Sequence, residues 1–383
     1  MRYRIACLTP LLVGDGRKLS PIDYMVWKDQ VNVLDQYRIF SLLSKGPRLD
    51  SYLGQLKRAE KLDFASWGGF AQNFAGRRIP FEHSSCAAHW ERARSEHLHI
   101  PTFFAGAGGP YLPGSALKGA LRTGMLYGAL REGALKRVAA QFQSDRPPRR
   151  PAEMLDQGEL GQNGACRMRI FRAADSDPVP VSSMKIYLLR VSSLVSRGPQ
   201  RYELGWKQSP RGTSDGRRPE EGTPLFAEMA VPGTVFEGEW GESAYLSQSD
   251  VARALNWREA VSRRRLFEAV NRYTAELLAI HKRYAEWTGL SLLAGNIEKL
   301  EARLNELRAG NDACLLSLGW GGGLLTKVSW LKTEEDVYRE IIRQVPIYGR
   351  NIAPSLPFPK TRRIVFLENH PAVLPGFVTV EVA

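Results

Sequence analysis

The sequence has few cysteines and no long apolar run, and these absences exclude several classes of protein. Its four cysteines, at positions 7, 86, 166 and 314, are scattered without paired spacing, which argues against a disulfide framework and fits a reducing cytoplasm. No apolar stretch approaches the roughly 20 residues of a membrane-spanning helix. The first residues also lack the cleavage site of a signal peptide. We therefore expect a cytoplasmic protein without a membrane partner.

Motifs for common catalytic chemistries are also missing. The sequence contains no H-E-x-x-H or G-x-S-x-G motif and no recognisable Ser-His-Asp order.

The sequence has an excess of positive charge, because 53 Lys and Arg residues against 40 Asp and Glu give a net charge of +13 and a pI near 9.7. Such an excess favours a polyanionic partner, either nucleic acid or an acidic membrane surface. The alternative is a basic enzyme with no such partner.

Hydrophobic periodicity predicts an α+β fold for the chain. The predicted strands are 3–13, 25–34 (a hairpin), 167–173, 182–193, 227–240 (a hairpin around Pro232-Gly233), 311–318 and 377–382. The predicted helices are 35–43 (capped by Asp35), 49–62, 115–131, 257–287 and one capped by Thr333. Three segments rich in turn-forming or polar residues are predicted to be loops: 66–109, 143–164 and 205–224.

The segment 112–122 (LPGSALKGALR) is typical of a turn that leads into a helix. We expect Ser115 to cap this helix, whose first amides lack intrahelical partners and can bind a phosphate. Lys118 and Arg122 are four residues apart and therefore share one helix face. Together with Gly114 they form a candidate phosphate site. The alternative is an ordinary capped helix with two exposed cations.

A glycine-rich stretch, 318–327 (LGWGGGLLTK), follows a predicted strand. Glycines permit positive φ and close approach of another backbone, and successive amides in a turn can bind phosphate. The stretch lacks both the Gly-Lys-Ser/Thr ending of a Walker loop and the G-x-G-x-x-G spacing of a dinucleotide site. The alternative is a tight turn or a subunit contact. The candidate contacts here are Gly321, Gly322, Gly323, Thr326 and Lys327.

A basic segment, 359–363 (PKTRR), lies between Phe358 and Phe366. Its cations and hydroxyl suit contacts to sugar and phosphate, and aromatic rings nearby could stack on bases. The alternative is an exposed basic loop. The candidate contacts are Lys360, Thr361, Arg362 and Arg363.

Two clusters of potential metal ligands are weaker candidates. Asp175 and Asp177 flank Ser176, but paired aspartates in a turn more often accept hydrogen bonds from local amides. A second segment contains His83, Cys86, His89, His97 and His99. It could bind zinc or cleave RNA, but no C-x₂-C pair and no partner base at a fixed spacing accompany it. We expect no metal, no cofactor and no catalytic residue.

Taken in order, these segments resemble the RAMP superfamily of CRISPR-associated proteins. Segment 112–122 is similar to the family's Pro-Gly-Ser-x-Leu-Lys-Gly-Ala-hydrophobic-Arg signature. The other similar segments are 9–16 (TPLLVGDG), 19–24 (LSPIDY), 171–177, 319–323, 360–363 and 375–377 (PGF). Within the superfamily, the sequence most resembles the type III-A (Csm) effector subunit that caps the 3′ end of the guide filament.

The resemblance implies two ferredoxin-like (RRM-like) RAMP domains with helical and loop insertions. We place the first domain at 1–165 and the second at 166–383, with a helical insertion around 250–310. Segments 143–164 and 205–224 have no counterpart in the family. The resemblance also implies contact with the 3′ side of the CRISPR RNA (crRNA) and docking on a neighbouring Cas7-like backbone subunit and other effector-complex subunits. It implies that this subunit is not the nuclease.

We therefore expect a non-catalytic, crRNA-binding capping subunit that acts in antiviral defence. Two alternatives stay open: a RAMP endoribonuclease that processes repeat RNA with a histidine or tyrosine, and a Cas7-like backbone subunit present in several copies. Two unequal halves and the long helix at 257–287 favour a single-copy cap.

Overall fold

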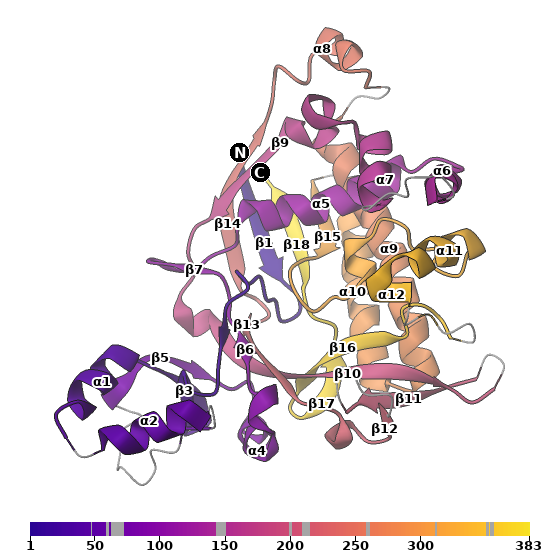
Figure 1. Ribbon diagram of the computed structural model, residues 1–383. Coiled ribbons are helices and arrows are strands. Elements are labelled where there is room, and N and C mark those ends of the chain that lie inside the picture. Colours follow the sequence, from indigo (N-terminus) through magenta and orange to yellow (C-terminus); the bar gives the residue numbers. More distant parts are fainter. Residues whose placement is uncertain are drawn as a thin grey trace.

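The fold consists of two antiparallel sheets, a long helix that touches both, and a small module near the N-terminus (Figure 1). The computed structural model describes residues 1–46, 48–58, 61–62, 73–142, 151–198, 201–208, 215–257, 261–310, 312–349, 352 and 356–383. In the part of the chain that it describes, no helix is long and apolar enough to cross a bilayer.

The first sheet has the strand order of a ferredoxin-like domain. Its strands, in spatial order, are β15 (Ala313–Ser317), β18 (Phe377–Val382), β1 (Arg2–Cys7), β14 (Val235–Glu242) and β9 (Phe171–Ser176). Numbering β1, β9, β14 and β18 along the chain gives the spatial order 4-1-3-2, with every neighbouring pair antiparallel. The helices α5 (Gly114–Ala129) and α9 (Arg263–Thr288) follow the first and third of these strands. The predicted α+β fold class is confirmed.

The second sheet is built from segments inserted between strands of the first. Its strands are β12 (Asp215–Gly216), β11 (Tyr202–Lys207), β10 (Met184–Ser196), β16 (Thr361–Leu367), β17 (His370–Val373) and β13 (Leu225–Ala230), which also pairs with β10. The chain thus leaves the first sheet after β9 and again after β15. The first sheet takes strands from both sides of residue 165, which is the predicted boundary between the two domains. That boundary stays a prediction.

The predicted hairpin at 227–240 is wrong. β13 pairs with β10 in the second sheet, whereas β14 pairs with β1 and β9 in the first. The turn at Pro232-Gly233, with Gly233 at φ 87°, therefore carries the chain from one sheet to the other. Alternating residues around a turn signal show that two strands exist, but they do not show which partners those strands choose.

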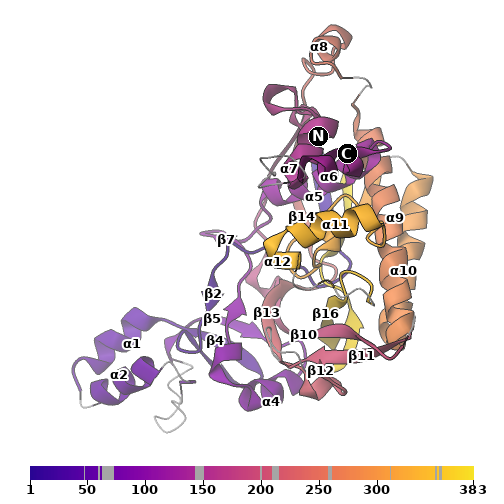
Figure 2. The same cartoon turned by 45° about the vertical axis from the view of Figure 1, so that its right-hand side comes forward.

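One helix packs against both sheets. Near the start of α9, the Phe267 ring lies 6.4 Å from that of Trp240 in the first sheet. Near its end, the Tyr284 hydroxyl is 2.9 Å from Ser192 Oγ in the second sheet. Ser262 caps its start, and Gly289 (φ 66°) ends it before α10 (Ser291–Ala309) turns back along it (Figure 2). The predicted helix at 257–287 is confirmed, although it begins later.

The N-terminal module has a small core of its own and projects from the body in Figure 1. It contains β3 (Tyr24–Trp27), β4 (Gln30–Leu34), β5 (Ala75–Pro80), α1 (Gln36–Leu43) and α2 (Leu49–Arg58). The predicted hairpin and the Asp35 cap are confirmed, since Asp35 Oδ1 accepts from the Arg38 amide at 3.0 Å. Arg77 attaches the module to the body through a 2.8 Å ion pair with Glu228, which is fully buried.

Several segments predicted to be loops contain regular structure. They hold β5 and α4 (Ser85–Arg92) within 66–109, α7 (Pro151–Leu160) within 143–164, and β12 with the end of β11 within 205–224. Tertiary contacts stabilise them; Glu159 of α7, for example, forms ion pairs with Arg131 (3.1 Å) and Arg137 (2.7 Å). The described helix α11 (Asp336–Gln344) is preceded by Glu335 rather than capped by Thr333. Predictions for 63–72, 143–150 and 209–214 lie outside the described residues.

Short elements complete the described chain. They are β2 (Lys18–Leu19), β6 (Ile100–Pro101), β7 (Ala105–Gly106), β8 (Gly109–Pro110), α6 (Ala134–Phe142), α8 (Ser249–Ala254) and α12 (Pro346–Gly349).

Candidate nucleic-acid interface

The N-cap of helix α5 lies two residues earlier than predicted, and the first amide of the helix is already occupied. Pro113 stands at the N-cap, so Ser115 lies inside the first turn and does not cap the helix. The Gly114 amide donates to Asp175 Oδ1 at 2.9 Å. A Cβ at Gly114 would lie 2.2 Å from the Ala173 carbonyl oxygen, so this glycine is explained by close packing on β9. The predicted phosphate site at the Gly114 amide is therefore filled by a carboxylate of the chain itself.

The exposed face of α5 presents small residues beside cations. Ser115, Gly119 and Arg122 are exposed, and Lys118 is half-buried next to them. A Cβ at Gly119 would have no heavy atom within 4 Å, so packing within the chain does not explain this glycine. The helix therefore offers a surface that a ribose-phosphate backbone can approach closely, with cations at its sides.

Two arginines that the sequence analysis did not select add positive charge near Lys118. Burial lowers the pKa of the Lys118 ammonium, and the charges of Arg172 and Arg169 lower it further. Like charges held together in this way are stabilised by a bound anion. The sequence contains these arginines in RMRIFR at 167–172, but the same alternation of charged and apolar residues is typical of a β-strand.

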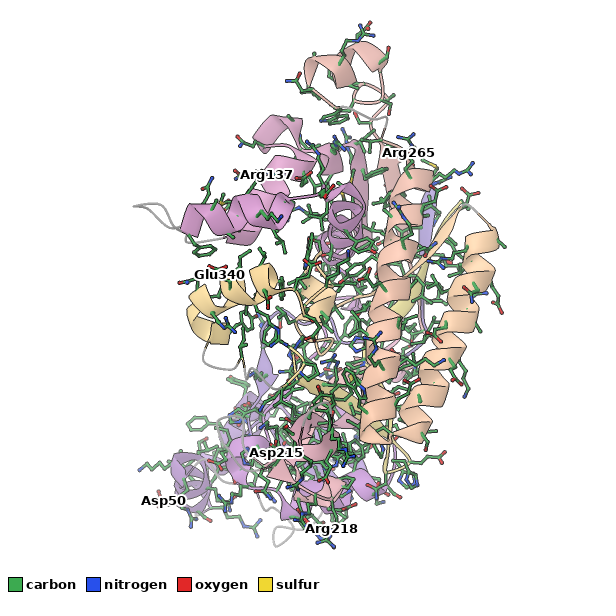
Figure 3. All side chains as sticks on the ribbon, turned by 90° about the vertical axis from the view of Figure 1, so that its right-hand side faces the viewer. Asp50, Arg137, Asp215, Arg218, Arg265 and Glu340 are labelled. Atoms are coloured by element: carbon green, nitrogen blue, oxygen red, sulfur yellow. The ribbon has the colours of Figure 1, made fainter. Side chains whose placement is uncertain are left out.

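Arg122 and Lys327 come from distant segments and line one cavity of about 650 Å³. Arg122 also pairs with Asp156 of α7 at 2.6 Å, and Lys327 ends the single 3-10 turn Leu325–Lys327. The cavity lies between α5, α6 and α7 on one side and α11 and α12 on the other. In Figure 3, Arg137 on α6 and Glu340 on α11 mark these two sides.

The glycine-rich loop packs against the segment that follows β1. The Trp320 amide donates to the Leu12 carbonyl at 2.7 Å, and a Cβ at Gly319 (φ 76°) would lie 2.1 Å from that same oxygen. Gly321 is buried, and Gly322 is half-buried against the side chain of Thr326. Thr326 is itself buried, and its hydroxyl donates to the Gly323 carbonyl at 3.2 Å. Of the predicted contacts in this loop, Gly323 and Lys327 are exposed.

Three segments that resemble the RAMP superfamily meet at the junction of the sheets. The Leu318 amide donates to the Gly376 carbonyl at 2.7 Å, and the Gly376 amide donates to the Pro10 carbonyl at 2.9 Å. The Phe377 amide donates to Thr9 Oγ1 at 2.9 Å. Segments 9–16, 319–323 (with Leu318 just before it) and 375–377 thus form one structural unit, although more than 300 residues separate the first from the second.

The basic segment 360–363 leads into β16 and is not an exposed loop. Thr361 pairs with Ser193 of β10. The Arg363 guanidinium lies 4.8 Å from the Trp320 ring centroid, which brings this segment against the glycine-rich loop. Burial lowers the pKa of the Lys360 ammonium, and the nearby charge of Lys207 on β11 lowers it further.

Arg362 is placed in the core rather than at the surface. It is 7% exposed, and its guanidinium donates to His281 Nδ1 at 2.9 Å and to the carbonyls of Pro359 (2.7 Å) and Thr361 (2.9 Å). Burial lowers the pKa of Arg362 to about 10. Burial and this arginine hold the pKa of His281 well below its usual range, which keeps the ring neutral and able to accept. These contacts give Arg362 a structural role.

The candidate metal ligands make other contacts. Asp177 pairs with Arg2 at 2.5 Å, and Ser176 Oγ accepts from the Leu112 amide at 2.9 Å. His89 Nε2 lies 2.7 Å from Asn369 Oδ1, and its Nδ1 lies 3.2 Å from Arg190. Among the described residues, no three or more His, Cys, Asp or Glu side chains are grouped as metal ligands would be.

The family model of the RAMP superfamily matches residues 4–195, and the chain belongs to that superfamily. No curated protein matches the sequence.

Two solved structures share the fold over the whole chain. One is a chain of the cryo-EM structure of a Csm-crRNA-target RNA ternary complex in a type III-A CRISPR-Cas system, with a TM-score of 0.68, 20% identity and 100% of both chains covered. The other is the crystal structure of T.onnurineus Csm5, with a TM-score of 0.63, 20% identity, and 99% of this chain and 100% of that chain covered. The RAMP fold is thereby confirmed.

Proposed function

We propose that this protein is the non-catalytic, crRNA-binding capping subunit of a type III-A (Csm) effector complex. It would contact the 3′ side of the guide and dock on a neighbouring Cas7-like backbone subunit. The observation that carries the proposal is the exposed cationic face of α5, which meets Lys327 of the glycine-rich segment at one cavity. Full-length similarity of fold to a chain of a crRNA-containing complex and to a Csm5 protein supports the same role.

The proposed RNA contacts are a subset of the sequence candidates plus two additions. We retain the accessible or half-buried residues Ser115, Lys118, Arg122, Gly322, Gly323, Lys327, Lys360, Thr361 and Arg363, and we add Gly119 and Arg172. Gly114, Gly321, Thr326 and Arg362 are left out, because they are buried and packed against other parts of the chain. Binding through phosphates makes recognition insensitive to sequence and sensitive to salt.

Replacing Lys118 and Arg122 together by alanine is expected to weaken the binding of single-stranded RNA and to flatten its salt dependence. Each phosphate contact to a single strand contributes about 0.7 to the slope of log K against log salt concentration, so the double variant should lose about 1.4. The measurement is a titration of labelled RNA at several salt concentrations.

The matched control is Lys299→Ala/Arg303→Ala on α10. Lys299 is exposed, and Arg303 is 40% exposed and ion-paired with Glu306, as Arg122 is 44% exposed and paired with Asp156. The control removes the same charge from another surface, so its slope should match that of the wild type. Equal slopes for both double variants would remove α5 from the interface.

The capping role and the lack of catalysis need a separate experiment. We expect one copy of the chain per reconstituted particle by native mass measurement, whereas several copies would identify a backbone subunit.

Repeat RNA incubated with the purified chain without metal should stay intact. A defined cut that is abolished by His83→Ala or His89→Ala would identify an endoribonuclease instead.

A further inference from the structure

Trp320 of the glycine-rich loop and Arg363 of β16 form a stacked pair at the edge of the second sheet. The guanidinium lies 4.8 Å from the ring centroid. Side chains alternate along a strand, so Arg362 points toward α9 whereas Arg363 emerges on the opposite face of the sheet, where it meets the loop. Both members of the pair are half-buried, so part of each side chain stays open to water.

The guanidinium of Arg363 has no polar partner. It forms no hydrogen bond or ion pair with any residue that the structure describes. Its Nε is buried, whereas its two terminal nitrogens are not and can reach a ligand. Burial lowers the pKa of this side chain, and no carboxylate in the described chain offsets that effect. A cation that has lost part of its hydration is stabilised when an anion binds to its terminal N–H groups.

The Trp320 ring orients this guanidinium without neutralising it. An arginine that is stacked on an aromatic face keeps its planar fork of N–H donors preorganised. The loop that carries the ring is itself fixed, because the Trp320 amide donates to the Leu12 carbonyl at 2.7 Å. Arg122, by contrast, is held by the carboxylate of Asp156, which cancels its charge. Stacking on Trp320 therefore leaves the whole charge of Arg363 available to a ligand.

The surroundings of the pair favour phosphate over a protein carboxylate. Lys327, at the end of the same loop, likewise has no hydrogen bond or ion pair within the part of the chain that is described. Two unpaired cations on one loop match a chain of phosphates, whereas a single carboxylate would leave one of them unpaired. Gly323 lies between Trp320 and Lys327 in the sequence and is exposed, and a Cβ there would have no heavy atom within 4 Å. A sugar-phosphate backbone can therefore approach this loop closely.

We propose that the Arg363 guanidinium, held on the Trp320 ring, binds a phosphate of the guide RNA, and that Trp320 acts as a positioning residue. The inference rests on the proposed function and deepens it, because it explains how one of the proposed contacts is oriented. It adds Trp320, which the sequence analysis did not select as a contact. It also gives the ring a different role from that of most aromatic side chains in RNA interfaces, which stack on bases.

A double-mutant cycle on RNA affinity tests the pair, with full-length protein and labelled single-stranded RNA. Arg363→Ala should weaken binding roughly tenfold and lower the salt slope by about 0.7, the effects of one charge-assisted phosphate contact. Trp320→Leu should weaken binding roughly threefold, the value of a cation–π contact at an accessible site, and Trp320→Phe should recover part of that loss. In the Arg363→Ala background, Trp320→Leu should cause no further loss of affinity.

Two controls account for the loss of a ring or a charge elsewhere. Trp287→Leu removes an indole ring that is 37% exposed on α9, and Arg303→Ala removes a guanidinium that is 40% exposed on α10. Both should bind RNA as the wild type does. Thermal unfolding of each variant identifies losses of binding that come from lost folding. Arg363→Gln, which keeps much of the side chain in place, keeps the test decisive if Arg363→Ala does not fold.

The possible outcomes separate this inference from the proposed function. Equal losses from Trp320→Leu with and without Arg363 would show that the ring acts independently of the arginine, and the inference would be wrong. Unchanged RNA affinity in both single variants would overturn the phosphate site and leave the proposed function standing on its other contacts. If those variants also failed to join neighbouring subunits, a carboxylate of a protein partner would be the ligand instead. Absence of RNA binding by the wild type would overturn both proposals.

Discussion

Alanine at Gly114 is expected to destabilise the fold by about 3 kcal/mol, whereas alanine at Gly119, one turn further along α5, is expected to stabilise it by about 0.5–1 kcal/mol. A Cβ at Gly114 would meet the backbone oxygens of Ala173 and Ala174 at 2.2 and 2.5 Å, and neither atom can move without shifting β9. Gly119 has open space around its Cα and gains helix propensity. Urea-induced unfolding of the two variants measures both effects.

A third variant separates stability from binding at Gly119. Gly119→Leu should also fold stably, because the position faces open space, but its side chain would stand where the RNA strand is proposed to lie. We expect lower RNA affinity together with an unchanged or higher unfolding midpoint. Full RNA affinity in this variant would show that the strand does not run over α5. Equal destabilisation by alanine at both glycines would contradict the packing argument.

Loss of the Arg362 side chain is expected to cost about 3 kcal/mol of stability, because it removes several buried hydrogen bonds at once. The side chain also stacks on the Tyr284 ring, 4.6 Å from its centroid, and so ties β16 to the end of α9. Arg362→Ala would leave His281 Nδ1 and two carbonyl oxygens without their donor. Urea-induced unfolding measures the change.

The comparison variant for this prediction is Arg264→Ala. Arg264 lies on the same helix as His281 and forms an exposed ion pair with Glu268 at 2.9 Å, so its loss should change stability by less than about 0.5 kcal/mol. A structural role and an RNA-binding role for Arg362 predict different results. If Arg362 contacted RNA, its removal would lower the salt slope of RNA binding and leave the unfolding midpoint unchanged. That result would contradict the structural role.

Local sequence patterns predicted the elements well where the pattern itself fixes the structure. The hairpin around Lys28-Asp29, the Asp35 cap, the helix ended by Gly289 and the alternating strand at 377–382 all depend on residues close together in the chain. The loop predictions for 66–109, 143–164 and 205–224 failed because the helices and strands in these segments depend on contacts with residues elsewhere in the sequence. Helix α7, for example, carries Glu159, whose two arginine partners lie outside it.

The candidate site shows the same limit. Sequence analysis selected Lys118, Arg122 and Lys327, but it could not show that Arg122 and Lys327 line one cavity. It also selected Arg362, because a buried arginine and an exposed one look identical in a run of cations.

The pairing of the first and last strands bears on how the protein is made. β1 is held between β14 and β18, and Arg2 and Ala383 exchange backbone hydrogen bonds of 2.9 and 3.0 Å. During translation β1 therefore cannot pair with β18 until residues 377–382 have left the ribosome, and contacts so far apart in sequence form slowly. The junction of 9–16, 318–323 and 375–377 likewise forms only after residues 375–377 have been synthesised. A chain that terminates before residue 375 would lack this junction, so we expect such chains to be excluded from assembly and degraded by proteases.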